Sequence, residues 1–233
     1  MTLAVQNLSV TDGTRTLLSG VSLTISPGQV TAVIGANGAG KSELVLALAG
    51  MLPISSGSVT LNGQPLKPTP EIIRRLGIAA VPEGHRVLSM LSVDDNLRAA
   101  GSLMGAKAAT QLAEVYAIFP ELAERKSQLA GTMSGGQQQM LALGHALMCA
   151  PRYLLIDEMS LGLAPLIVKR LLSVVMTLKA QGTGILLIEQ FTDLALSIAE
   201  SAVVLRSGKM RHAGPASALI ADKTLLQNAY FGV

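Results

Sequence analysis

Eight residues at positions 35–42 have the types and the spacing of a loop that binds phosphate. Their sequence, GANGAGKS, fits the pattern G-x-x-x-x-G-K-[ST]. Glycines let backbone N–H groups converge on phosphate oxygens, Lys41 can reach the β and γ oxygens, and the Ser42 hydroxyl can bind Mg²⁺. A chance glycine-rich turn would not need an apolar stretch before it and a helical pattern after it. We therefore expect a nucleotide to bind at Gly35, Ala36, Asn37, Gly38, Ala39, Gly40, Lys41 and Ser42.

A second set of candidate residues follows the apolar stretch YLLI, where Asp157 and Glu158 stand side by side. In a parallel sheet, ligands bind beyond the carboxyl ends of the strands, which is where these acids would lie. Asp157 would hold Mg²⁺ through water, and Glu158 would orient and deprotonate an attacking water. Two solvated acids that cap the next helix are the alternative. The phosphate loop upstream favours hydrolysis of the bound nucleotide, with Lys41 and Ser42 also taking part.

Glu43 is an acid placed directly after the phosphate loop, in the first turn of the expected helix. There it gains about 0.3–1 kcal/mol from the helix dipole. A carboxylate about 4 Å from a phosphate charge loses about 4 kcal/mol at an effective dielectric constant of 20. Repulsion therefore dominates if the side chain points at the phosphates, although Lys41 and Mg²⁺ offset part of it. We expect weakened nucleotide affinity, not its loss.

Composition limits the classes to which the chain can belong. Its 233 residues, 49% of them hydrophobic, suffice for one or two domains with a sizeable core. The longest apolar stretch, 44–54, contains Gly50 and Pro53 and is too short to span a bilayer. We expect no signal peptide, because no basic segment precedes an apolar one at the start. The single cysteine, Cys149, excludes an internal disulfide, fits the cytosol and is expected to be a buried packing residue.

Charge and aromatic content argue against nucleic acid as a partner. The net charge is +3, the 18 Lys and Arg are spread along the chain, and the only aromatic residues are three Tyr and three Phe. High apolar content without a spanning segment indicates instead that another protein covers part of the surface.

The order of the patterns predicts an α/β protein with a helical insert. Period-two alternation in LAVQNLSV and VSLTIS, around the turn TDGT, predicts an antiparallel sheet, and GSVTLNGQPL adds a strand with a turn at Asn62 and Gly63. The stretches QVTAVIG, LGIAAVPE, RYLLIDE and GILLIEQ read as buried strands. AVVLRSGKMRHAG predicts a terminal hairpin that turns at Ser207 and Gly208.

Between these strands, residues 94–150 show helical spacing, with Met140, Leu143 and Leu147 on one face. We therefore expect one domain, 1–233, with a core formed by 1–82 and 151–233 and a helical subdomain formed by 83–150.

The segment MSGGQQQM gives the chain its family resemblance. Alone, Ser134, Gly135, Gly136 and Gln137 could be a capped helix start and nothing more. Just upstream of YLLIDE, they resemble the signature of the ATP-binding-cassette (ABC) ATPases, a resemblance that covers essentially the whole chain. The stretches AAVPEGHRVLSMLSVDDNL, SGGQQQMLALGHALMCAPRYLLIDEMSLGLAPLIV, LLIEQ and AYFG resemble the ATPase subunits of branched-chain amino-acid importers.

The resemblance implies a P-loop NTPase cassette: a RecA-like core with a mixed sheet, an N-terminal antiparallel β subdomain and an inserted helical signature subdomain. Two cassettes would pair head to tail, so that residues 134–137 face the γ-phosphate bound by the partner. Glu83 would sense Mg²⁺ and the γ-phosphate, and Gln190 would stand at the switch position. Residues 160–163 would cross the dimer interface, and 83–95 would meet a membrane subunit.

The function implied is ATP hydrolysis that drives the import of branched-chain amino acids or a related small solute, with ATP and Mg²⁺ as cofactors. The catalytic residues would be Glu158, Gln190 and Lys41, and the metal residues Ser42, Asp157 and Glu83. The partners would be a second ATPase subunit (a sister chain or a second copy), permease subunits and, indirectly, a solute-binding protein, with the chain peripheral on the cytoplasmic face of the membrane. A slow or regulatory cassette beside an active sister is the alternative, and the signature disfavours a small-molecule kinase.

Some positions depart from the family pattern. Asp12 stands where an aromatic residue usually stacks on adenine, and Arg15 could stack there instead. Met159 replaces a proline and Phe191 a polar residue. The histidines, His85, His145 and His212, have no spacing suited to a metal, and Tyr153 is expected in the core.

Overall fold

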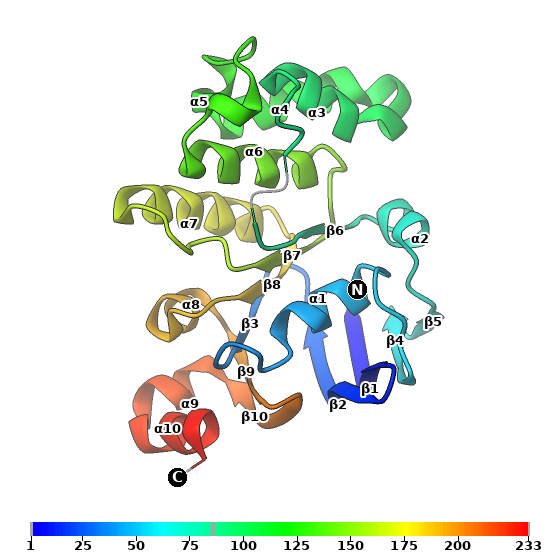
Figure 1. Cartoon of the computed structure of the whole chain (residues 1–233), viewed down its shortest axis with the longest axis vertical. Helices are drawn as coiled ribbons and strands as arrows, with labels where there is room; N and C mark the ends of the chain where they lie inside the picture. The colour runs from blue at the N-terminus through cyan, green and yellow to red at the C-terminus, as the bar shows by residue number, and fades with distance from the viewer. Residues whose placement is uncertain (1, 85–86, 233) are drawn as a thin grey trace.

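A ten-stranded mixed sheet forms the centre of the protein, in the strand order β5-β4-β1-β2-β10-β9-β3-β8-β7-β6. The computed structural model describes residues 2–84 and 87–232. Figure 1 shows helices on both sides of this sheet and a separate helical layer at one end. The strands are β1 Leu3–Asp12, β2 Arg15–Ile25, β3 Val30–Ile34, β4 Ser56–Leu61, β5 Gln64–Leu66, β6 Ile78–Val81, β7 Tyr153–Asp157, β8 Gly184–Ile188, β9 Ser201–Arg206 and β10 Lys209–Pro215.

The N-terminal part of the sheet is antiparallel, as the alternating pattern predicts. β1 pairs with β2 on one side and β4 on the other, and β4 pairs with β5. Asn62 and Gly63 have φ angles of 56° and 77°. A two-residue hairpin turn that matches the strand twist requires positive φ at both positions, so this Asn-Gly pair sets the turn.

The parallel strands β9, β3, β8, β7 and β6 carry the main core. β3, β7 and β8 are buried along their whole length, which confirms that both sheet faces are covered. Alternate residues face opposite layers: Leu154 and Ile156 belong to the cluster with α6 and α7, whereas Leu155 packs in the cluster with α1. The flanking helices are α1 Lys41–Leu48, α2 Pro70–Arg75, α7 Pro165–Ala180 and α8 Thr192–Ile198.

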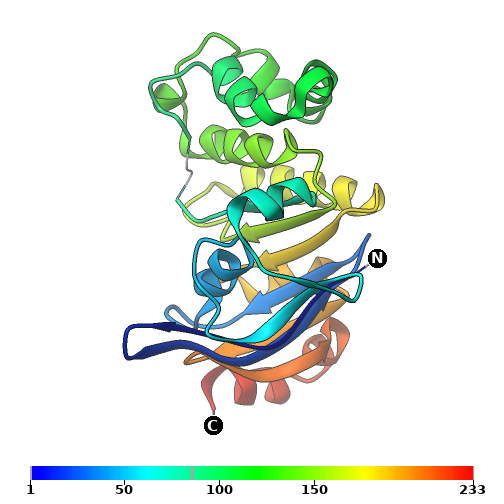
Figure 2. The same cartoon turned by 90° about the vertical axis from the view of Figure 1, so that its right-hand side faces the viewer.

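The helical layer is built from several short helices, because proline and glycine interrupt the helical pattern. Gly101 ends one helix, and Pro120, which cannot continue the helix before it, starts a new one. Figure 2 shows this layer as a separate tier beyond α7. The α-helices are α3 Val93–Ala100, α4 Ala108–Ile118, α5 Pro120–Ala123 and α6 Gly135–Leu147, with 3-10 turns at Ser102–Lys107 and Ala130–Thr132.

Within this layer, Met140, Leu143 and Leu147 of α6 are all buried, as their spacing predicts. The division at residues 83 and 150 between core and helical subdomain stays a prediction. No helix of the described residues is long and apolar enough to cross a membrane.

The hairpin of β9 and β10 is not the end of the fold, so that expectation is wrong. Two further helices follow it, α9 Ala216–Ala221 and α10 Lys223–Phe231. Together with α8 they bury the face of β3 and β9 that carries Ala32, Ile34 and Val204. Without them this apolar face would be exposed to water.

Candidate active site

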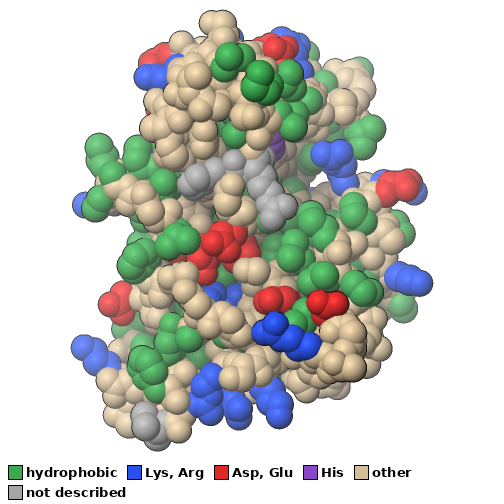
Figure 3. Space-filling view, viewed as in Figure 1, with side chains coloured by type: hydrophobic (Ala, Val, Ile, Leu, Met, Phe, Trp, Pro, Cys, Tyr) green, Lys and Arg blue, Asp and Glu red, His purple; other side chains and the backbone are tan. Residues whose placement is uncertain are grey.

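A cavity of about 240 Å³ opens beyond the carboxyl ends of the central strands. It gathers residues from the phosphate loop, from the segment after β6 and from the segments after β7 and β8. Figure 3 shows acidic side chains near the middle of the face on which this region lies. The lining residues are Asn37, Gly38, Gly40, Lys41, Ser42, Glu43, Glu83, Glu158 and Gln190. The fold thus brings half of the predicted site residues to the cavity lining, together with the unusual Glu43.

The phosphate loop, residues 35–42, joins β3 to α1 and is held tightly against its neighbours. Gly40 caps α1 with a φ of 101°, a conformation that suits glycine. A Cβ atom on Gly40 would lie 2.6 Å from Leu18 Cδ2 of β2, so the site leaves no room for a side chain. The backbone can therefore turn its N–H groups toward a ligand at the start of the helix.

Lys41 is buried at the base of the cavity, only 4% exposed. Its Nζ donates to the carbonyl oxygens of Gly35 (2.8 Å) and Ala36 (3.2 Å). It also lies 3.6 Å from Glu158 Oε1. The loop and the acid together fix the ammonium group where phosphate oxygens would enter.

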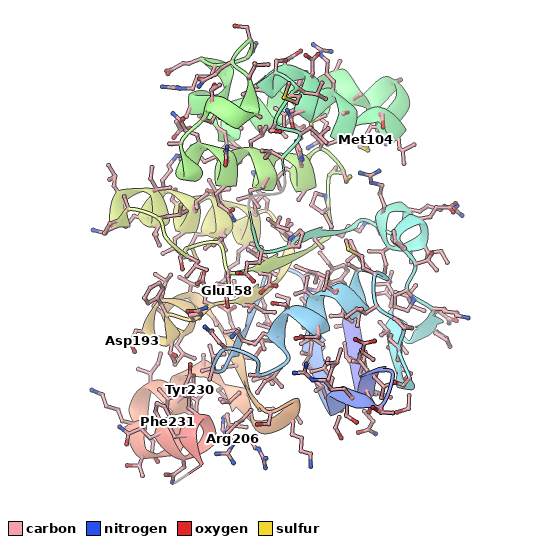
Figure 4. The ribbon with its side chains drawn as sticks, in the orientation of Figure 1. Met104, Glu158, Asp193, Arg206, Tyr230 and Phe231 are labelled. Atoms are coloured by element: carbon pink, nitrogen blue, oxygen red, sulfur yellow. The ribbon has the colours of Figure 1, made fainter. Side chains whose placement is uncertain are left out.

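Glu158, labelled in Figure 4, lies in the middle part of the molecule. Its N–H donates to the Ile188 carbonyl of β8 (3.0 Å), and its Oε2 accepts from Gln190 Nε2 (2.9 Å). Its φ angle is 52°, in the left-handed region that non-glycine residues seldom adopt. The backbone thus holds this carboxylate in a strained conformation between Lys41 and Gln190.

Asp157, the last residue of β7, has a carboxylate suited to a metal ion. Burial raises its pKa to about 6, the Ser42 side chain lowers it through a hydrogen bond, and the charges of Glu158 and Glu83 raise it. Its Oδ1 is buried and has no hydrogen-bond partner among the described residues. An unpaired buried oxygen beside a hydroxyl fits Mg²⁺, which binds one or two carboxylates together with substrate phosphates. Within residues 2–84 and 87–232, no group of three or more His, Cys, Asp or Glu side chains could hold a metal ion by itself.

The signature segment, residues 134–137, does not reach the cavity of its own chain. Ser134 and Gln137 form a capping box: the Gln137 N–H donates to Ser134 Oγ (3.4 Å) and the Ser134 N–H to Gln137 Oε1 (3.0 Å). Gly136 is buried, and a Cβ on it would lie 2.8 Å from Ile167 Cγ2 of α7. Ser134 and Gly135 remain exposed at the start of α6.

Sequence reasoning missed one contact beside this site, between Ser160 and Glu189. Ser160 Oγ donates to Glu189 Oε2 over 2.5 Å, and both side chains are almost fully buried. Burial raises the pKa of Glu189 to about 7, against the lowering effect of hydrogen bonds from Ser160 and the Gln190 backbone. Its Oε1 has no hydrogen-bond partner among the described residues. No local pattern in LLIEQ signals that this acid is buried.

The positions that depart from the family pattern have different surroundings. Asp12 and Arg15 pair at the exposed tip of the β1–β2 hairpin, whose second strand touches Gly40 through Leu18. Arg15 is not among the residues that line the cavity, and its stacking on adenine stays a prediction. Met159 is buried, whereas Phe191 is 57% exposed beside Gln190.

The other singled-out side chains lie away from this cavity. Burial lowers the pKa of His145 on α6 to about 4, so its ring is neutral at physiological pH. Cys149 is half-buried, which corrects the expectation of a buried packing residue. Tyr153 is buried in the core as expected, and His85 lies outside the described residues.

Comparison with known proteins decides the family. The ABC transporter family matches residues 18–160, more than half of the chain. The chain belongs to the ABC transporter family. The high-affinity branched-chain amino acid transport ATP-binding protein BraG of Pseudomonas aeruginosa is 42% identical over 92% of this chain and 93% of its own length. The probable branched-chain amino acid transport ATP-binding protein LivF of Archaeoglobus fulgidus is 36% identical over 88% of both chains.

Solved structures of ABC cassettes have the same fold. The ADP conformation of MJ1267, an ATP-binding cassette of an ABC transporter, has a TM-score of 0.87 at 25% identity over 100% of both chains. The ATP binding subunit of another ABC transporter has a TM-score of 0.86 at 29% identity. These matches confirm the predicted cassette fold, and this ABC cassette is an ATPase that binds and hydrolyses ATP.

Proposed function

We propose that this ABC cassette hydrolyses ATP to drive the import of branched-chain amino acids or a related small solute. The convergence of Lys41, Glu158 and Gln190 on one cavity carries the proposal of an active motor. The solute is supported by the 42% identity to BraG, whose name gives it a role in branched-chain amino acid transport.

Each side chain of the site has a separate task. The triphosphate binds along the loop 35–42, and Lys41 exchanges its contacts with Gly35 and Ala36 for the β and γ oxygens. Glu158 accepts the proton of the attacking water. Gln190 orients the water or the γ-phosphate by hydrogen bonds, because an amide cannot carry the proton itself.

The residues that would hold Mg²⁺ are Ser42 and Asp157, with Glu83 beside the γ-phosphate. Two observations support this assignment. Asp157 Oδ1 is buried and has no hydrogen-bond partner among the described residues, and Ser42 and Glu83 line the cavity. When bound there, the ion would neutralise part of the charge of the phosphates.

A second cassette, either a sister chain or another copy, completes each ATP site. The exposed start of α6, with Ser134 and Gly135, lies outside the cavity of its own chain and is free to face a partner's γ-phosphate. A helix N-terminus that presents N–H groups suits this task. Gly136 and Gln137 hold that helix start in place.

A permease subunit is the proposed partner on the apolar surface. Leu88, Met90 and Leu91, within the predicted docking segment 83–95, are exposed, and a groove of about 550 Å³ between α1, α2 and α6 is lined by Met51 and Leu103. Exposed apolar residues of this kind suit the apolar face of a cytoplasmic helix. The cassette would then sit peripherally on the cytoplasmic face of the membrane, with a solute-binding protein acting indirectly. His85 and Arg86 of this segment lie outside the described residues.

A slow or regulatory cassette is the second candidate function, and Glu43 favours it. Its carboxylate lines the cavity together with Glu83 and Glu158, which adds negative charge where a triphosphate binds.

ATP hydrolysis by the purified chain distinguishes the two candidates. Glu158→Gln is expected to abolish turnover and retain Mg-ATP binding, whereas Glu114→Gln, at an exposed position of α4, is expected to leave both unchanged. The same substitutions are then made in the complex with the sister and membrane subunits. Equal turnover by that complex with Glu158→Gln would establish the regulatory role.

The solute is tested in liposomes that contain the complete transporter. Addition of a binding protein loaded with leucine is expected to stimulate hydrolysis, and the same protein loaded with urea is the control. Stimulation by urea and not by leucine would overturn the proposed solute class.

A further inference from the structure

We propose that buried Glu189 is a positioning residue for ATP hydrolysis, which ties the turn at the cassette interface to the catalytic Glu158. The inference rests on the proposed function, because it assigns a role within the same site. The turn comprises residues 160–163 and is called the interface turn below.

The interface turn has a buried root and an exposed tip. Ser160, its first residue, is 3% exposed, whereas Leu161 is 41% exposed. The Leu163 N–H donates to the Ser160 carbonyl (3.2 Å), and Gly162 supplies a positive φ of 71°. The turn is therefore compact, with its tip at the surface and its root inside the protein.

The root of the turn is held by a hydrogen bond to Glu189. Ser160 Oγ donates to Glu189 Oε2 over 2.5 Å. Glu189 directly follows β8, so the bond joins the turn after β7 to the end of the neighbouring strand. A displacement of Ser160 must therefore displace the Glu189 carboxyl.

Glu189 in turn controls the position of Gln190. Glu189 directly precedes Gln190 in the chain, so the two residues share a peptide bond and a shift of one displaces the other. The Gln190 side chain donates to Glu158 Oε2 over 2.9 Å, and Glu158 lies 3.6 Å from Lys41. A continuous series of contacts thus runs from the interface turn through Glu189 and Gln190 to the acid that activates water.

A purely structural role explains Glu189 less well. A buried carboxyl whose Oε1 has no hydrogen-bond partner among the described residues destabilises the fold relative to an apolar side chain of similar size. Packing alone would therefore be served better by leucine. The acid instead connects two segments that flank the site, through its hydrogen bond to Ser160.

Steady-state hydrolysis by the full chain tests the proposal with Ser160→Ala, Glu189→Leu, the double variant and Glu189→Gln. Leucine keeps the volume and removes the acceptor, whereas glutamine keeps an acceptor oxygen. Each of the first two substitutions is expected to lower kcat at least tenfold, with KM for ATP within threefold. The kcat of the double variant should lie no more than threefold below that of the less active single variant, because both substitutions break the same connection. Glu189→Gln should return kcat to within threefold of the unsubstituted chain.

The matched control is Thr31→Val, which removes another buried hydroxyl that bonds the Thr24 carbonyl (3.0 Å) within the sheet. It should lower the melting temperature at least as much as Ser160→Ala and leave kcat unchanged. The proposal is overturned if Ser160→Ala and Glu189→Leu keep kcat within threefold, or if their effects on kcat multiply in the double variant. Failure of the proposed function would give a different result: hydrolysis would then be unaffected by Glu158→Gln.

Discussion

Single carboxylates decide how well this site binds and splits its nucleotide. In the proposed function Glu158 and Asp157 serve the reaction, whereas Glu43 adds a negative charge to the cavity that Glu158 lines. The helix dipole at the start of α1 favours an acid at Glu43 by less than the nearby phosphates disfavour it. The acid at this position should therefore reduce affinity.

Replacing Glu43 by threonine is expected to tighten Mg-ATP binding about tenfold, which corresponds to about 1.4 kcal/mol. The gain is smaller than the bare repulsion because Lys41 and Mg²⁺ offset part of the charge. Equilibrium binding at low and high salt measures the effect, which should shrink as salt screens it. Glu71→Thr, at an exposed position of α2, is the control. Unchanged affinity would show that the Glu43 carboxylate points away from the phosphates.

Glu189 should make the stability of the protein depend on pH. Burial raises its pKa from 4.5 to about 7, so between these pH values the folded chain keeps a proton that the unfolded chain has lost. Stability then falls as pH rises through this window. At about 1.4 kcal/mol per pKa unit, the unsubstituted chain should lose about 3 kcal/mol more than Glu189→Gln between pH 5 and pH 8.

Urea unfolding without nucleotide or Mg²⁺ at these two pH values measures the difference. The raised pKa of Asp157 contributes equally to both chains and cancels. Parallel pH dependence of the two chains would contradict a raised pKa at Glu189.

At the scale of elements, one arginine ties the core to the helical layer. Arg170 of α7 donates from Nε to Glu121 Oε1 of α5 (2.7 Å), also bonds the Ile118 carbonyl, and lies over the Phe119 ring. Both partners of this ion pair are about two-thirds shielded from water. The contact holds α5 on the helix that follows the interface turn.

Arg170→Met is expected to lower the free energy of unfolding by about 1.5–3 kcal/mol, because charged hydrogen bonds to Glu121 and to a carbonyl are lost. Arg75→Met breaks an ion pair of which both members are mostly exposed, and should cost less than about 0.5 kcal/mol. Urea unfolding midpoints of the two variants give the comparison. Equal losses would mean that the contact of Arg170 is no stronger than a surface ion pair.

Elements with a strong local signal could be predicted from the sequence. The Asn62-Gly63 turn and the buried strand before Asp157 are examples, since turn residues and apolar runs act over a few positions. Helices α9 and α10 were missed, although Asp222, whose side chain accepts from the Leu225 N–H, is a readable start signal for α10. The phosphate loop and the acids Asp157 and Glu158 could be predicted because each directly follows an apolar stretch that reads as a buried strand.

The bond between Ser160 and Glu189 could not be predicted in this way. It joins residues 29 positions apart, and only the pairing of β7 with β8 brings them together. The same holds for the burial that raises the pKa of Glu189.

At the scale of the whole molecule, the proposed pairing of two cassettes assigns the exposed start of α6 and the cavity to different ATP sites. Gly135→Asp puts an acid in the first turn of α6, where the dipole stabilises it by about 0.3–1 kcal/mol, so the fold should persist. The same charge would repel the γ-phosphate of a partner cassette. Hydrolysis by the assembled transporter should fall by at least half, with ATP affinity of the isolated chain unchanged.

Ala109→Asp, an acid in the first turn of α4 at an exposed position, is the control and should hydrolyse ATP normally. Normal hydrolysis by Gly135→Asp in the assembled transporter would exclude the start of α6 from both ATP sites.

The left-handed backbone at Glu158 also bears on how such cassettes diverge. A φ of 52° disfavours glutamate by about 1–2 kcal/mol relative to glycine, which adopts this conformation freely. If a duplicated gene encodes a cassette that no longer needs to hydrolyse ATP, replacement of the glutamate would make that cassette more stable. Degenerate sisters of this motor should therefore drift toward glycine or asparagine at this position, and their loss of catalysis would be hard to reverse, because restoring the acid would require the fold to be weakened again.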